Sequence, residues 1–127
     1  MSFVTRLALL FALLASLFCA PAKAWDFEVG TSLVCDTQAQ VERFVALFAD
    51  NAQAAVQVVN AEEQNPSACA IMNVAYKRGI QISMARHGDN AFEIVRILVV
   101  GLETDNGIVP VRPAVYFSLF GVKEYAV

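Results

Sequence analysis

Acid–base chemistry in this 127-residue chain would depend on His87, its single histidine. His87 stands two positions before Asp89, and a carboxylate can orient an imidazole as a general base. Such a base needs a nucleophile, yet Ser83 and Ser118 lack the small-residue turn of a nucleophile elbow. Zinc would need several further His or Cys ligands. We expect His87 in an exposed turn without a catalytic role, and keep a small hydrolase using His87 with nearby carboxylates as the alternative.

Acidic residues occur in three close pairs, and paired carboxylates can hydrolyse glycosidic bonds. The pairs are Asp26/Glu28, Glu62/Glu63 and Glu103/Asp105. Glycoside hydrolysis needs a long cleft, which a domain of this size rarely builds, and each pair stands near the expected end of an element. A calcium loop before Gly107 would place Leu102 at a ligand position, which Leu102 cannot fill. The sequence therefore predicts no catalytic residue, no metal site and no cofactor.

The N-terminal segment determines the compartment in which the cysteines function. Residues 1–24 combine a positive charge, an apolar stretch and a small-x-small site, which is the layout of a secretory signal. The apolar stretch of twelve residues would rise about 18 Å as a helix, short of the ~30 Å hydrocarbon core of a bilayer. Bulky Phe18 disfavours lipidation of Cys19. We expect cleavage between Ala24 and Trp25, no permanent membrane anchor, and a periplasmic or extracellular protein.

Cleavage would leave a single small domain, 25–127, with two cysteines, Cys35 and Cys69. In an oxidising compartment this pair predicts one disulfide, and its wide spacing disfavours a redox-active or zinc-binding pair. Closing the loop between them would stabilise the fold by ~3–4 kcal/mol through the entropy of the unfolded chain. The predicted role of these cysteines is therefore structural.

The charge of the mature chain excludes some classes of partner. Without the two basic residues of the signal, seven basic residues face twelve acidic ones, a net charge of −5. Nucleic-acid affinity comes mainly from clustered Lys and Arg, and the pair Lys77-Arg78 adjoins Gly79 in an expected turn. We predict no nucleic-acid binding. An inhibitor of a basic secreted enzyme, such as a lysozyme, would suit this charge.

The first half of the mature chain predicts a strand and two short helices. Residues 26–34 alternate as a strand should. Thr37 followed by Gln40 fits a capping box, and an apolar stripe at helical spacing follows: Val41, Phe44, Val45 and Phe48. Asp50 or Asn51 can cap a second helix with the same spacing, which a proline ends.

The second half predicts four strands, at residues 68–76, 80–86, 92–102 and 109–120. The turns between them fall at residues 77–79, 87–90 and 103–107. The Asn106-Gly107 pair favours a type I′ hairpin, in which both central residues have positive φ. Pro110 and Pro113 cannot donate to a ladder, so the start of the last strand must lie at an edge or a bulge.

The last two strands are apolar on both faces, whereas a one-sided antiparallel sheet alternates apolar with polar residues. Two amphipathic helices can cover one face. The other face needs a sheet that curls around its own interior, or a partner molecule. We predict an α+β fold: an N-terminal strand and two short helices packed on a four-stranded antiparallel, strongly curled, partly barrel-like meander. A homodimer interface is the alternative.

Aromatic residues near the C-terminus are the remaining candidates for a functional surface. Tyr116, Phe120 and Tyr125 could contact a partner or ligand, although aromatics at strand spacing more often belong to a core. With no catalytic signature, we predict an exported, non-enzymatic binding or accessory protein. Its partner would be an unidentified protein or small ligand.

Overall fold

A computed structural model describes residues 26–122 and shows an α+β fold, as predicted. The elements in chain order are β1 (Glu28–Cys35), α2 (Gln38–Leu47), α3 (Ala52–Glu62), β2 (Cys69–His87), β3 (Asn90–Thr104) and β4 (Gly107–Val122). The predicted signal peptide, its cleavage site at Ala24 and Trp25, and Tyr125 lie outside the described residues.

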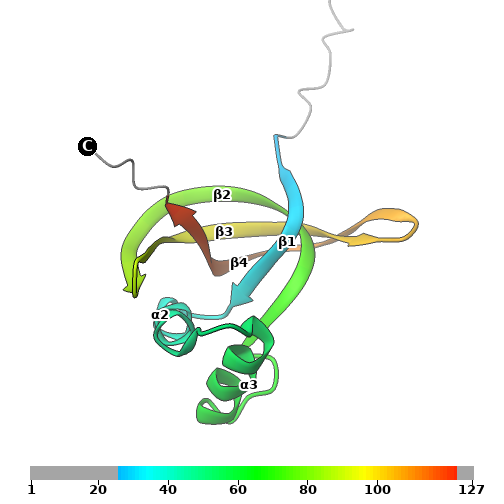
Figure 1. Cartoon of the computed structure of the whole chain (residues 1–127). Coiled ribbons are helices and arrows are strands. Elements are labelled where there is room, and N and C mark those ends of the chain that lie inside the picture. Colours follow the sequence, from blue (N-terminus) through cyan, green and yellow to red (C-terminus); the bar gives the residue numbers. More distant parts are fainter. Residues whose placement is uncertain (1–25, 123–127) are drawn as a thin grey trace, which may run out of the picture.

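The four strands form one antiparallel sheet that curls into a ring (Figure 1). β1 pairs with β2 along its whole length, β2 with β3, and β3 with β4. The ring closes where Cys35 of β1 stands opposite Phe117 of β4. Register shifts in the β2–β3 ladder let the long β2 bend, because an extra residue in one strand increases its local twist. The predicted curled meander is confirmed.

The turn predicted at residues 77–79 is wrong, because β2 runs without a break from Cys69 to His87. The glycine that suggested a turn has another role. A Cβ on Gly79 would come within 2.7 Å of the carbonyl oxygen of Arg96 on β3, so glycine is needed there for close approach of two backbones. The sheet consequently has four strands in total, β1 included, instead of four after β1.

Both remaining turns are hairpins, as predicted. His87 pairs with Asn90 across the β2–β3 turn, and Thr104 pairs with Gly107 across the β3–β4 turn. The type I′ geometry predicted for Asn106-Gly107 is wrong. Gly107 has φ 104°, but Asn106 is not among the described residues with positive φ. A single glycine with positive φ directly after the turn, as Gly107 is here, is typical of a hairpin with a G1 bulge.

The two helices begin at the predicted caps. Thr37 forms the expected capping box with Gln40 at the start of α2, and the Asn51 side chain accepts a hydrogen bond from the Ala54 amide at the start of α3. Their apolar stripes are buried against the sheet, through residues Val41, Phe44, Val45, Ala55, Val56 and Val59. In Figure 1 both helices lie on one side of the curled sheet.

The two faces of the sheet are buried in different ways, which explains why the strands are apolar on both. One face packs under the helices, where Leu33 and Ile94 join the helical stripes. Residues that point to the opposite side of the strands pack on one another, and we call them the inner core: Val34, Val74, Tyr76, Val95, Ile97 and Val99. Both faces of the sheet therefore bury apolar residues within one chain, while Ile108, Val109 and Val115 of β4 stay exposed.

The prolines of β4 lie at an edge, as predicted. β4 joins β1 only at Phe117, so the part of β4 that holds Pro110 and Pro113 has β3 alone as its partner. A register shift opposite this segment, between Val99 and Gly101, marks a bulge. Proline on an open edge leaves fewer free N–H groups for a further strand.

The predicted disulfide is present between Cys35 and Cys69. Both residues are buried, and they stand opposite each other in the β1–β2 register. A disulfide is consistent with an exported protein in an oxidising environment. Between residues 26 and 122, no helix has the length and apolar character needed to cross a membrane.

Candidate binding site

A large hollow on the side of the strands that carries the inner core is bordered by all four strands, and we call it the inner hollow. Its volume is about 690 Å³, within the ~300–1,000 Å³ typical of small-molecule sites. All four strands and the loop before β2 contribute to its lining, which comprises Val34, Asp36, Pro66, Ser67, Ala70, Met72, Val74, Val99, Leu102, Val111, Arg112, Ala114 and Tyr116. Most of these side chains are apolar, so the wall of the inner hollow carries few polar groups.

Two charged residues of the lining, Asp36 and Arg112, are exposed and therefore border the opening of the inner hollow. Asp36 directly precedes Thr37, the N-cap of α2. A carboxylate near a helix N-terminus is stabilised by the helix dipole. Asp36 therefore has a structural role that does not depend on a ligand. Arg112 makes no ion pair within residues 26–122. Its guanidinium is thus available to a bound molecule.

Another polar cluster on the sheet is already satisfied internally. Arg78 makes a bidentate ion pair with Glu28, with N–O distances of 2.9 and 3.0 Å, and its guanidinium lies 3.6 Å from the centre of the Phe120 ring. Burial lowers the pKa of Arg78, but hydrogen bonding and the charge of Glu28 outweigh this and raise it overall. This cluster joins β1, β2 and β4 and leaves little unpaired charge for a ligand.

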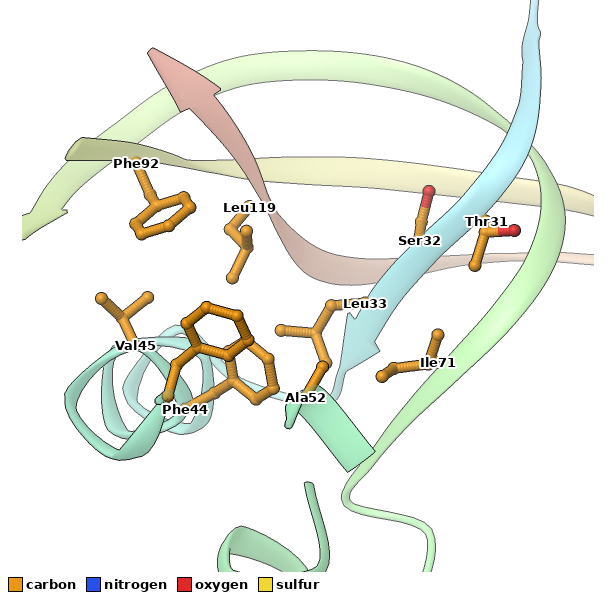
Figure 2. Close-up of a pocket in the computed structure, with 10 residues that line it drawn as sticks. Thr31, Ser32, Leu33, Phe44, Val45, Ala52, Ile71, Phe92 and Leu119 are labelled. Atoms are coloured by element: carbon orange, nitrogen blue, oxygen red, sulfur yellow. The ribbon is translucent and has the colours of Figure 1, made fainter. Parts of the chain in front are cut away.

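A second, smaller apolar site lies between the helices and the sheet, and we call it the outer cleft. Its volume is about 210 Å³. In Figure 2, Phe92 and Leu119 from the sheet point toward Phe44 and Val45 of α2, while Leu33 and Ile71 form the neighbouring wall. Phe44 and Val45 belong to the main core. The outer cleft is therefore a gap in the packing of the helices and has no charged group for orienting a ligand.

Two of the three aromatic residues predicted as a partner surface, Tyr116 and Phe120, pack on the same side of the strands as the inner hollow. Tyr116 and Phe120 are half-buried and pack against the inner core, and the Phe120 ring centre lies 6.0 Å from that of Tyr76. Tyr116 also lines the inner hollow. Tyr116 therefore borders the inner hollow, Phe120 packs beside Tyr76, and Tyr125 is outside the described residues.

The structure does not bring His87 together with a catalytic partner. Within residues 26–122, its ring makes no hydrogen bond or ion pair with a carboxylate or hydroxyl, and it stands at the tip of the β2–β3 hairpin. Two of the acidic pairs are engaged through one member each, Glu28 with Arg78 and Glu62 with Arg43. The hydrolase alternative therefore gains no support from geometry.

No metal-binding cluster is formed either, since the described residues contain no group of three or more potential His, Cys, Asp or Glu ligands.

Comparison with known proteins does not assign a class. No protein family matches the chain, and no curated protein or solved structure is similar to it.

The residues of the inner hollow were not identified from sequence. The signal that pointed toward them was the apolar character of both faces of the last two strands, which predicted a curled sheet. That pattern does not reveal where the curled sheet is filled and where it is open. Met72, Leu102 and Arg112 become neighbours of one hollow only through the curvature of β2 and the register of β3 and β4.

Proposed function

We propose that this chain is an exported, non-enzymatic binding protein that holds a small ligand in the inner hollow. The observation that carries the proposal is the hollow itself, about 690 Å³ of largely apolar space bordered by all four strands. Apolar side chains that line an open hollow stay in contact with water, which is unfavourable. Retaining such a hollow is understandable if a ligand completes the packing.

Export supports the proposal and also limits the ligand's source. The disulfide indicates an oxidising environment, and the signal-like residues 1–24 predict release into the periplasm or the extracellular space. The ligand would then be a molecule of that compartment. Inhibition of a basic secreted enzyme stays a prediction from the charge of −5, since no surface feature of the described residues favours it over ligand binding.

The proposal can be tested with N-phenyl-1-naphthylamine, a neutral apolar dye that fluoresces in dry sites. The oxidised mature protein should bind it saturably at a one-to-one ratio. Ala114→Phe, which would fill the inner hollow, should remove this signal. Ala54→Phe is the matched control, because Ala54 is exposed on α3 and away from the hollow.

Two outcomes would refute the proposal. One is the absence of saturable binding by the folded, oxidised protein. The other is equal binding by Ala114→Phe and Ala54→Phe when both variants keep the circular dichroism spectrum of the unmodified protein. The second result would place the dye at another surface, such as the outer cleft.

A further inference from the structure

We propose that the inner hollow selects a single-chain amphiphile with one anionic group, and that Arg112 binds this group. The inference rests on the proposed function and specifies the chemistry of its ligand. It requires an apolar wall for the hydrocarbon chain and a cation that is free to bind the head group. It must also account for Asp36, an acidic residue that lines the same hollow.

The wall suits a hydrocarbon chain because the apolar side chains come from every strand. Val34, Val74 and Val99 belong to the inner core and are at most 7 % exposed. Leu102 and Val111 pack against this core from the other side of the lining. A hydrocarbon chain in the hollow would contact these groups and lose its own contact with water, which favours binding.

The cation is identified by comparing Arg112 with other arginines of the fold. Arg43 is paired with Glu62, Arg78 with Glu28, and Arg96 lies 5.9 Å from the centre of the Phe117 ring. Arg112 has no such partner among residues 26–122 and borders an apolar hollow. A guanidinium binds carboxylates and phosphates through parallel N–H···O bonds, so Arg112 fits an anionic head group.

Asp36 limits the charge of that head group. Its carboxylate borders the same hollow, and its position just before the N-cap of α2 explains its presence without a cationic ligand. A ligand with several negative charges would be repelled by Asp36. A monoanion with an apolar chain, such as a fatty acid, satisfies Arg112 at the smallest electrostatic cost.

Calorimetric titration of the oxidised mature protein with three probes of equal chain length tests the inference. The probes are laurate and dodecylammonium, each below its micelle concentration, and 1-dodecanol below its solubility limit. Laurate should bind roughly tenfold more tightly than 1-dodecanol, the gain expected from a charge-assisted hydrogen bond, and dodecylammonium should bind most weakly. Arg112→Gln should reduce laurate affinity to that of 1-dodecanol, and Arg112→Lys should restore part of it.

Lys77→Gln is the matched control, because it removes an exposed positive charge that does not line the inner hollow. It should leave all three affinities unchanged. Equal affinity for laurate and 1-dodecanol, or equal effects of Arg112→Gln and Lys77→Gln, would overturn the inference while the proposed function stands. If none of the three probes and no neutral dye binds, the proposed function itself fails.

Discussion

The Asn60 side chain of α3 makes the two hydrogen bonds to the main chain of Cys69 that a neighbouring strand would otherwise make. Its Oδ1 accepts a hydrogen bond from the Cys69 amide at 2.8 Å, and its Nδ2 donates to the Cys69 carbonyl oxygen at 3.0 Å. Cys69 and Cys35 stand opposite each other with their Cα atoms 4.1 Å apart, a spacing typical of a pair that does not exchange main-chain hydrogen bonds. The free main-chain groups of Cys69 therefore point away from β1, toward Asn60.

This relationship predicts that Asn60→Ala destabilises the fold by about 1–3 kcal/mol, because it leaves a buried amide and a buried carbonyl without partners. A third hydrogen bond, from Nδ2 to the Pro66 carbonyl oxygen, would also be lost. Urea unfolding monitored by circular dichroism would measure the effect. Gln57→Ala, at an exposed position of the same helix, should change stability by less than about 0.5 kcal/mol. Equal effects of the two substitutions would contradict this role.

The disulfide is expected to contribute separately from Asn60. Replacing both cysteines, Cys35→Ala with Cys69→Ala, should lower the free energy of unfolding by about 3–4 kcal/mol, since the loop closed by the bond spans 34 positions. Dithiothreitol should destabilise the unmodified protein and leave the double variant unchanged. A double variant as stable as the oxidised protein would show that packing alone holds β1 on β2.

The sequence predicted these helices because their signals are local. The capping box at Thr37 and the cap at Asn51 involve residues three positions apart. The disulfide follows instead from counting, because Cys35 and Cys69 are the two cysteines outside the predicted signal segment. The continuity of β2 could not be predicted in this way. A glycine after Lys77-Arg78 resembles a turn signal, and only the position of β3 shows that Gly79 lies under the Arg96 carbonyl.

That contact makes Gly79 sensitive to substitution. Gly79→Ala should destabilise the fold by at least about 1 kcal/mol, because its Cβ would lie 2.7 Å from a main-chain oxygen that cannot move aside without disturbing the ladder. Gly30→Ala is the control, since a Cβ there has no neighbour within 4 Å. It should be neutral or stabilising by up to about 1 kcal/mol. Thermal unfolding of both variants measures the contrast, and a neutral Gly79→Ala would contradict the proposed close approach.

The binding site was less accessible to sequence reasoning than the fold. The aromatic character of Tyr116 makes it a candidate from sequence, and Tyr116 lines the inner hollow. Arg112 drew no attention because an isolated arginine between two prolines resembles a solvated charge on an edge strand. Arg112 becomes a candidate only because other arginines pair with carboxylates in the folded protein, as Arg78 does with Glu28. The sequence does not show which arginines form such pairs.

Ser118 of β4 tests what a buried hydroxyl without a hydrogen-bond partner costs in stability. It is 0 % exposed, and its hydroxyl is the buried side-chain oxygen without a hydrogen-bond partner among the described residues. Burying an unsatisfied hydroxyl costs about 1–3 kcal/mol, so Ser118→Ala should leave stability unchanged or raise it by about 1 kcal/mol. Chemical denaturation of the ligand-free protein measures this. A loss of more than about 1 kcal/mol would indicate that the hydroxyl has a partner, such as a buried water molecule.

The Arg43–Glu62 ion pair, which joins α2 to α3 at 2.8 Å, predicts a pH dependence of stability. The hydrogen bond from Arg43 lowers the pKa of Glu62 below its ordinary value. A carboxylate with a lowered pKa stabilises the folded state above its unfolded pKa, roughly 4.3, and loses that contribution as the pH falls through the folded value. The stability difference between the unmodified protein and Glu62→Gln should therefore be constant near neutral pH and shrink below about pH 4.3.

The effect should be small, because both side chains are exposed and salt screens such pairs. The Arg43→Gln background separates the ion pair from other roles of Glu62. In that background the further substitution Glu62→Gln should have a much weaker pH-dependent effect, because Glu62 has lost the guanidinium that lowered its pKa. Urea unfolding of the four proteins at several pH values between 3 and 7, in low salt, completes the cycle. An unchanged pH dependence in the Arg43→Gln background would assign the shift to a group other than Arg43.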